Sequence, residues 1–323
     1  MTNLFNNKTV AITGGGGYIA GAIIAALKKT PAKIIRVSRR DLEEDYLVKS
    51  LKMDVQTREF WDEVVNVSDI IIHLAGNTSV YAAAKEPAES LNSTVLPLTH
   101  LIAAAQKARR KPRVVYASTA TVYGINNKGP LLENVLPDPA TTYDLHKFFA
   151  ERQLKFASEN KILEGVSLRL ANVYGPSPSK SASDDRGILN KIARFSLAGN
   201  NIQLYGDGNY LRDYIYIEDV DSAFLTAGVA KNVSGRSFNV ATGRSVTIQD
   251  AFQMVVSQVK ELTGNDTIIE YVDWPENVDP IEFRNFVAST SNFKEIAGWS
   301  SKINIEDGIC KMIKSFYNEI RVK

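Results

Sequence analysis

A tyrosine and a lysine four residues apart could handle a proton. Tyr143 and Lys147 follow Thr141 and Thr142, which are typical of a capped helix start, so the phenol and the ammonium are expected on one helical face. A neighbouring ammonium favours the phenolate and lowers the pKa of a tyrosine from about 10 toward neutrality, which makes the phenol a usable general acid or base. The same spacing also fits an exposed pair on a helix.

Hydroxyl side chains follow a strand-like stretch upstream of this pair. Residues 114–118 are followed by the run from Thr119 to Gly124. If 114–118 form a strand of an open α/β sheet, Thr119 lies at its C-terminal end, where such sheets bind ligands. Thr119 could then hold a substrate oxygen, and the alternative is a threonine in an ordinary turn.

Four consecutive glycines, Gly14 to Gly17, lie between an apolar stretch at 10–12 and an apolar-faced segment that reaches about Lys29. Glycine suits a phosphate-binding turn because a side chain would keep the backbone N–H groups and the helix N-terminus from closing on a pyrophosphate. The run therefore predicts a dinucleotide cofactor, and the alternative is a structural turn.

The elements that would position these residues alternate along the chain. Short β-branched runs recur with helix-length segments between most of them, which predicts an α/β fold with a Rossmann-type doubly wound parallel sheet. The runs lie at 10–13, 34–38, 70–75, 114–118 and 166–170.

From Asn172 onward the pattern is less regular and indicates a smaller, mixed α/β domain. Strand-like pieces lie near 203–205 and 237–240, and helical patterns lie near 248–263 and 306–320. We expect an NADP-binding Rossmann domain of residues 1–172 plus about 208–236, and a substrate domain of about 173–207 and 237–323.

Composition excludes several classes of protein. The 323 residues are 44% hydrophobic and carry a formal net charge of +2, which favours neither a nucleic-acid nor a membrane partner. Cys310 is the only cysteine and the histidines are scattered, so we expect no internal disulfide and no metal site. The absence of an apolar signal core or an apolar run near eighteen residues predicts a cytoplasmic protein.

Further motifs complete a known pattern. The chain resembles the nucleotide-sugar branch of the extended short-chain dehydrogenases/reductases over essentially its whole length. In chain order the matching motifs are the glycine-rich turn, Ile72-His73-Leu74-Ala75-Gly76, Asn92, Ser118-Thr119, Tyr143-x-x-x-Lys147, Arg169-Leu-Ala-Asn172-Val-Tyr-Gly175-Pro176, Gly206-Asp-Gly208, Arg212-Asp-Tyr-Ile-Tyr-Ile-Glu-Asp219, Phe238-Asn-Val-Ala-Thr-Gly243 and Ala297-Gly298-Trp299.

The resemblance implies a catalytic set and a cofactor site. Thr119 would bond the reacting sugar oxygen, Tyr143 would exchange its proton, and Lys147 would hold the nicotinamide ribose and tune Tyr143. The implied cofactor contacts are Gly14, Gly17, Tyr18, Ile19, Ser38, Arg39, Arg40, Asp54, Val55, Leu74, Ala75, Gly76, Asn92, Ala117, Tyr143 and Lys147.

The resemblance also implies a nucleotide-diphosphate sugar as substrate and a homodimer. Asn172 and Arg212 would contact the diphosphate, since a guanidinium matches phosphate oxygens. Arg212 could instead form a salt bridge with Asp213 or Asp219. Whether Arg284 replaces a phosphate contact that the family places nearby is open.

The end of the second strand departs from the pattern of NAD-binding relatives, which usually carry an acid there. Ser38, Arg39 and Arg40 remove a carboxylate that would repel a 2′-phosphate and add two guanidiniums that can pair with it. This favours NADP(H), with NAD(H) possible. The alternative is a pair of solvated arginines beside the acidic residues within 41–44.

Other departures narrow the reaction. Dehydratases of the family carry carboxyls where this chain has Ala120 and Thr121, so dehydration is not expected. Members that epimerise two carbons use a cysteine and a histidine, but Cys310 lies near the C-terminus and Ser177 stands where the histidine is expected. The leading hypothesis is NADPH-dependent reduction of a keto group on a nucleotide-linked, possibly 6-deoxy, sugar. The alternatives are a 4-epimerase with bound NAD(P) and a catalytically silent NADP-sensing protein.

Overall fold

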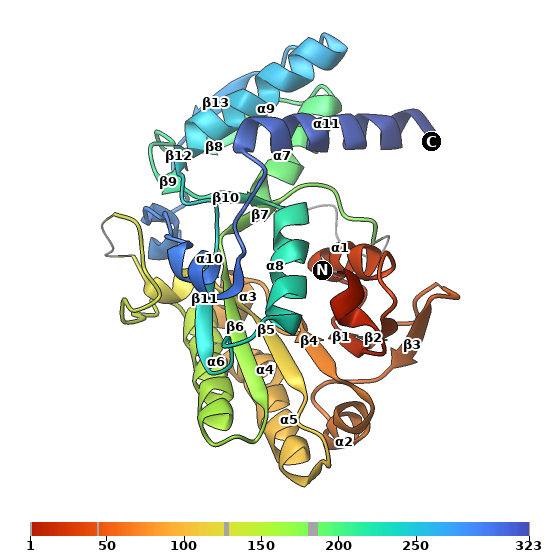
Figure 1. Ribbon diagram of the computed structural model, residues 1–323. Helices are drawn as coiled ribbons and strands as arrows, with labels where there is room; N and C mark the ends of the chain where they lie inside the picture. The colour runs from red at the N-terminus through yellow and green to blue at the C-terminus, as the bar shows by residue number, and fades with distance from the viewer. Residues whose placement is uncertain (1, 44, 126–128, 180–186, 323) are drawn as a thin grey trace.

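A seven-stranded parallel sheet forms the centre of the structure. The computed structural model describes residues 2–43, 45–125, 129–179 and 187–322. Every neighbouring pair of strands in this sheet is parallel, in the order β11-β6-β5-β4-β1-β2-β3 (Figure 1). The strands are β1 (Thr9–Thr13), β2 (Lys33–Ser38), β3 (Val48–Lys52), β4 (Ile70–His73), β5 (Arg113–Thr119), β6 (Glu164–Leu170) and β11 (Arg236–Val240).

The strand order reverses between β1 and β4. The chain runs outward from β1 to β2 and β3, then returns to β4 and continues through β5 and β6 on the other side. Crossovers that leave in opposite directions open a crevice at the C-terminal ends of β1 and β4, where sheets of this kind bind ligands. The predicted doubly wound, Rossmann-type fold is confirmed.

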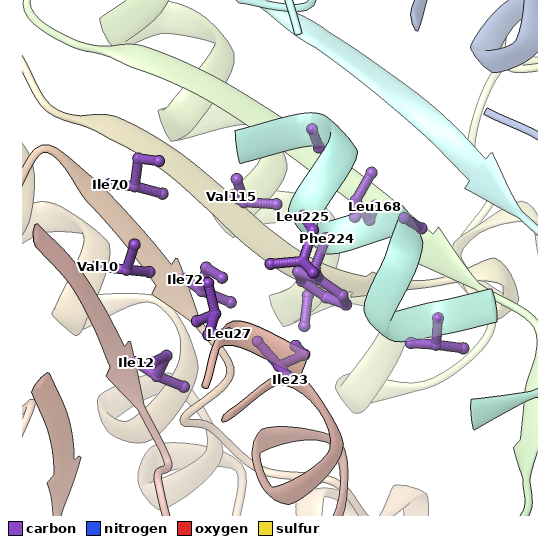
Figure 2. Packing of buried hydrophobic residues seen from close by; sticks show 14 of the residues in the cluster. Val10, Ile12, Ile23, Leu27, Ile70, Ile72, Val115, Leu168, Phe224 and Leu225 are labelled. Atoms are coloured by element: carbon purple, nitrogen blue, oxygen red, sulfur yellow. The ribbon is translucent and has the colours of Figure 1, made fainter. Parts of the chain in front are cut away.

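One face of the sheet is covered by a layer that contains α1 and α8. Val10 and Ile12 from β1 pack with Ile23 and Phe224 from these helices, as Figure 2 shows. Because both faces of the sheet are covered, the central strands are apolar along their length. The helices of this layer are α1 (Tyr18–Leu27), α8 (Ile217–Val229) and α10 (Ser291–Ala297).

The opposite face is covered by α2, α5 and α6. The intervening strand residues Ala11, Ile71 and Tyr116 are buried there against Trp61 and Leu154. Two short helices, α3 and α4, pack on α6. The bounds are α2 (Arg58–Val67), α3 (Val80–Lys85), α4 (Pro87–Thr94), α5 (Leu96–Lys107) and α6 (Thr142–Glu159).

A smaller group of elements lies above the sheet in Figure 1 and has its own core. The last helix, predicted near 306–320, contributes Ile309, Met312 and Phe316 to this core. Among the described residues, no helix is long and apolar enough to cross a membrane. The elements are β7 (Asn172–Tyr174), α7 (Ile188–Leu197), β8 (Ile202–Tyr205), β9 (Leu211–Arg212), β10 (Tyr214–Tyr216), β12 (Val246–Thr247), α9 (Ile248–Thr263), β13 (Ile269–Val272) and α11 (Ile305–Val322). The 3-10 helices are η1 (Thr2–Phe5), η2 (Ala120–Tyr123) and η3 (Pro280–Phe283).

Two strands of the large sheet correct the sequence analysis. All five expected strands form, but β3 was not expected because only Val48 of its residues is buried and the rest of the edge strand is largely polar. Residues 237–240 were expected in the smaller domain, yet β11 pairs with β6. Phe238 explains this placement, since it stacks on Phe293 with ring centroids 4.7 Å apart in the main core.

Candidate active site

A cavity of about 400 Å³ opens at the crevice where the strand order reverses. It gathers the three predicted catalytic side chains together with predicted cofactor and substrate contacts from distant parts of the chain. The predicted residues that line it are Gly14, Gly17, Tyr18, Ile19, Leu74, Ala117, Thr119, Tyr143, Lys147 and Asn172. We call this space the reaction cavity.

A second cavity of about 440 Å³ shares Gly14, Gly17 and Leu74 with the reaction cavity. The two therefore adjoin across the glycine-rich turn, as a dinucleotide site requires. Its lining holds most of the remaining predicted cofactor contacts, namely Ser38, Arg39, Arg40, Asp54, Val55, Ala75 and Gly76. We call it the cofactor cavity.

Asn92 is the one predicted cofactor contact that lines neither cavity. Its side chain is exposed on α4, whereas Ser93, one residue further, lines the cofactor cavity. Ser90 and Thr94 are buried and mark the inward face of α4. Successive helical residues point about 100° apart, so the face that holds Ser93 turns Asn92 away.

The glycine-rich turn is closely packed against the sheet. Gly14 has a φ of +67°, which favours glycine, and its neighbour Gly15 donates its N–H to the carbonyl of Val37 at 2.8 Å. A Cβ on Gly15 would lie 2.9 Å from the Cβ of Arg36. Helix α1 follows without a side-chain cap, so its first N–H groups are available to a phosphate.

Lys147 is buried at the base of the reaction cavity. Its side chain comes from α6, whose start is capped by Thr141 as predicted, and its Nζ donates to the carbonyl of Ala117 at 3.0 Å. The Nζ lies 5.0 Å from the ring centroid of Tyr116 and 5.8 Å from that of Tyr143. The tyrosine and lysine therefore share one face, as the spacing predicts.

The surroundings of Lys147 disfavour the charged form of its amine. Burial lowers the pKa of Lys147 to about 8, while the negative charge of Glu151 raises it. Only 4% of the residue is exposed. A small change in these surroundings can therefore shift the pKa of Lys147 across the physiological pH range.

Glu151 braces α6 against two strands one helical turn below Lys147. Its carboxylate accepts hydrogen bonds from Arg169 on β6, at 2.7 Å for Nη2 and 3.0 Å for Nε, and from the Ser118 hydroxyl on β5. Both partners of the ion pair are almost completely buried. The brace holds the end of β5, and with it Thr119, in place beside α6.

His73 shapes the turn between the two cavities. The Thr13 hydroxyl oxygen accepts the N–H groups of Leu74 and Ala75, both at 3.2 Å, and lies 2.7 Å from Nδ1 of His73. Thr13 must then donate its proton to Nδ1, which places the ring proton on Nε2. Burial lowers the pKa of His73 to about 3, so the ring is a neutral structural group.

Arg212 makes contacts that sequence reasoning did not foresee. Its guanidinium is buried and donates to the carbonyls of Leu211 at 3.1 Å, Glu282 at 2.6 Å and Arg284. Among the described residues Arg212 forms no ion pair with Asp213 or Asp219. The Asp213 carboxylate accepts hydrogen bonds from residues 242 and 243, and that of Asp219 accepts the N–H groups of residues 302 and 303. Three of the five guanidinium donors are occupied, so two remain for a ligand.

Burial and the positive charge of Arg284 lower the pKa of Arg212 to about 10. Arg284 donates through Nη1 to the carbonyl of Ile281 at 2.7 Å. Asn172 lines the reaction cavity and donates through Nδ2 to the carbonyl of Asp213 at 3.2 Å. The segment that carries Arg212 therefore lies next to the reaction cavity, although neither Arg212 nor Arg284 is among its lining residues.

A third cavity, of about 620 Å³, shares Ile188 with the reaction cavity and is rich in aromatic side chains. Its wall includes the stacked rings of Tyr205 and Trp274, whose centroids lie 5.5 Å apart. We call this cavity the aromatic groove. The sequence does not indicate it because its residues come from six separate segments, and no segment carries a recognisable binding motif. Flat apolar walls of this kind suit a planar ring.

Comparison with protein families gives a match over most of the chain. The model described as the NAD dependent epimerase/dehydratase family matches residues 10–241. This stretch contains the glycine-rich turn, Thr119, Tyr143, Lys147 and Asn172.

Relatives of known activity match over nearly the whole length. A UDP-glucose 4-epimerase of Azospirillum brasilense is 28% identical and covers 95% of this chain and 91% of its own. A GDP-6-deoxy-D-mannose reductase of Pseudomonas aeruginosa is 26% identical, and the match covers 96% of this chain and 97% of the reductase. The structure of UDP-glucose 4-epimerase from Thermotoga maritima with UDP-glucose has a TM-score of 0.85 and 26% identity, and the match covers 98% of this chain and 100% of that one.

Replacement of the buried lysine tests its electrostatic cost. Lys147→Met is expected to raise the free energy of unfolding of the cofactor-free protein at pH 7 by about 1–3 kcal/mol, because a desolvated ammonium is removed. The pKa of about 8 in the folded protein lies below the ordinary lysine value of 10.5, so the unfolded chain binds more protons between these pH values. The cost is fully present below pH 8 and is lost as the pH rises toward 10.5.

Chemical denaturation of both proteins at several pH values measures this effect. The advantage of the variant should shrink as the pH rises above 8. A variant that is less stable than wild type at pH 7 would contradict the inference that the buried ammonium of Lys147 destabilises the folded protein.

Proposed function

This chain belongs to the NAD-dependent epimerase/dehydratase family, and we propose that it is an NADPH-dependent reductase of a keto group on a nucleotide-diphosphate sugar. The observation that carries the proposal is the convergence of Thr119, Tyr143 and Lys147 in one cavity that adjoins the cofactor cavity. Relatives with this family's activities include both reductases and epimerases, so they support an enzyme that acts on a nucleotide sugar.

The residues at the end of β2 favour NADPH as the reductant. Arg39 and Arg40 line the cofactor cavity and form no ion pair within the described part of the chain. Asp41, a candidate partner, is instead paired with Lys52 at 2.7 Å. Two guanidiniums beside Ser38 are therefore available to a 2′-phosphate.

The side chains around the reaction cavity can complete a reduction. A nicotinamide cofactor bound in the crevice would supply the hydride to the keto carbon. Tyr143 would protonate the oxygen of the sugar as it gains charge, and Thr119 would hold that oxygen in place. Lys147 would stabilise the phenolate that remains on Tyr143, because its ammonium lies on the same face.

The substrate would extend from the reaction cavity toward the aromatic groove. The groove shares Ile188 with the reaction cavity. A nucleotide base that lies against Tyr205 in the groove could therefore be linked through a diphosphate to a sugar at Thr119. Asn172 and the two remaining donors of Arg212 are the candidate diphosphate contacts. The homodimer and the cytoplasmic location stay predictions.

A 4-epimerase is the second candidate. It is supported by the two UDP-glucose 4-epimerases that match nearly the whole chain. It would use the same three side chains but would oxidise and then reduce one carbon, without net consumption of cofactor. The shared cavity of Thr119, Tyr143 and Lys147 speaks against the silent NADP-sensing alternative, since a sensor needs no proton donor.

Cofactor turnover separates the two enzyme candidates. We expect purified protein to hold little cofactor and to consume added NADPH with a UDP- or GDP-linked 4-keto-6-deoxy sugar. Tyr143→Phe should lower turnover on the order of a hundredfold or more and leave cofactor affinity nearly intact, because only the proton donor is lost. Tyr46→Phe, at a tyrosine that is 97% exposed, is the matched control. Tightly held oxidised cofactor and interconversion of sugar epimers without added NADPH would favour the epimerase.

Cofactor selectivity tests whether Arg39 and Arg40, at the end of β2, bind a 2′-phosphate. NADP(H) is expected to bind at least about tenfold more tightly than NAD(H), which corresponds to about 1.4 kcal/mol. Fluorescence titration should show that Arg39→Ala combined with Arg40→Ala removes the preference. Lys33→Ala removes a cation from the opposite end of β2 and should leave it unchanged. Equal affinities of wild type for the two cofactors would refute this assignment.

Arg212→Ala tests the substrate class. We expect the KM for the nucleotide sugar to rise by one to two orders of magnitude, since a desolvated guanidinium–phosphate pair contributes roughly 1.5–3 kcal/mol. Stability should also fall because three carbonyl contacts are lost. Asn285→Ala removes only the contact to the N–H of Leu211 and controls for loosening of the same segment. A similar KM in both variants would contradict the diphosphate role.

A further inference from the structure

A chain of hydrogen bonds runs from the reaction cavity to a buried carboxylate at the start of α6. The hydroxyl oxygens of Thr119 and Thr121 lie 2.8 Å apart, and the Thr121 hydroxyl donates to Oδ1 of Asp144. The hydroxyl of Thr141 donates to Oδ2 of Asp144 at 2.8 Å and accepts its backbone N–H at 3.1 Å. The side chain of Asp144 is completely buried and has no access to solvent.

Donor counting fixes the direction of this chain when Asp144 is ionised. A carboxylate only accepts, so the single proton of Thr121 is committed to Asp144. The oxygen of Thr121 must then accept the proton of Thr119. The Thr119 oxygen also accepts the backbone N–H of Thr121 at 3.3 Å, which leaves one lone pair and no proton for a ligand.

The direction reverses when Asp144 carries a proton. A carboxylic acid donates to Thr121, Thr121 then donates to Thr119, and the proton of Thr119 becomes free for the cavity. A keto oxygen needs a donor and a sugar hydroxyl can use an acceptor. The two directions of the chain therefore match the two oxidation states of a sugar carbon.

The environment of Asp144 shifts its pKa toward the protonated form. Burial raises the pKa of Asp144, whereas hydrogen bonds from Thr121 and Thr141 and the charge of Arg284 lower it. Arg284 acts from the segment after η3, and Tyr143, His146 and Lys147 are the titratable residues nearest to Asp144 in sequence on α6. Residues of η2 contribute hydroxyls but no charge to this contact.

We propose that Asp144 and Thr121 are positioning residues that set the hydrogen-bond direction of Thr119. With a carboxylate at position 144, Thr119 offers a lone pair to a sugar hydroxyl; with a carboxylic acid, it offers a proton to a keto oxygen. The proposal rests on the proposed function for the identity of the ligand at Thr119. Neither Asp144 nor Thr121 is among the lining residues of the reaction cavity.

An NMR titration tests the chain without substrate. The side-chain carboxyl carbon of Asp144 reports its protonation in the cofactor-free protein. Thr121→Val should raise the pKa of Asp144, because the carboxylate loses a hydrogen-bond donor, and Thr121→Ser should restore it. An unchanged pKa in Thr121→Val would overturn the proposal.

The pH profile of turnover tests the role of the chain. In wild type, kcat/KM for the 4-keto-6-deoxy sugar nucleotide should fall as the pH rises through the pKa of Asp144, because Thr119 ceases to donate. Thr121→Val should lose this limb and lower kcat about tenfold, whereas Thr121→Ser should keep both near wild type. Thr226→Val, which removes a buried helical hydroxyl bond remote from the cavity, is the matched control and should keep the wild-type profile.

A double variant, Thr121→Val combined with Thr119→Val, tests whether Thr121 acts through Thr119. If Thr121 acts through Thr119, the double variant should turn over no more slowly than Thr119→Val alone. Additive losses, or a wild-type pH profile in Thr121→Val, would overturn the proposal. Absence of turnover in wild type would refute the proposed function instead, while the NMR titration still tests the chain by itself.

Discussion

The burial of one ammonium constrains the whole site. Lys147 can remain charged inside the fold only because the carbonyl of Ala117, the ring of Tyr116 and the charge of Glu151 offset part of its lost hydration. Glu151 is itself buried and needs the guanidinium of Arg169 in turn. This dependence ties α6 to β5 and β6, so the helix that carries Tyr143 and Lys147 cannot slide without leaving a buried charge unpaired.

Features that depend on local chemistry could be predicted from the sequence. The turn at Gly14 needs a positive φ and close approach of the backbone, which only glycine permits at no cost. The cap at Thr141 and the four-residue spacing of Tyr143 and Lys147 follow from helix geometry alone. The apolar runs of the central strands follow from coverage on both faces, and this fixed the fold class.

Features that depend on distant partners could not be predicted. The strand at 237–240 has the same apolar pattern in either domain, and only packing of Phe238 on Phe293 decides its place. Asn92 and Ser93 differ by one helical position, so a motif match cannot choose between them without the buried face of α4. Arg212 was expected to contact a diphosphate, with a carboxylate pair as the alternative, and neither expectation included the carbonyls of the segment after residue 280 that the fold brings to it.

Two buried carboxylates on α6 illustrate how the same chemical group does different work in one site. Glu151 pairs with the guanidinium of Arg169 and serves as a rigid brace between α6 and β6. Asp144 faces hydroxyl groups, which can both donate and accept, and Arg284, whose charge lowers its pKa, is bonded through Nη1 to a backbone carbonyl. A carboxyl held by hydroxyls can change its protonation state without breaking the contacts that hold it. Rigid support and a reversible hydrogen-bond direction can therefore coexist two helical turns apart, on either side of Lys147.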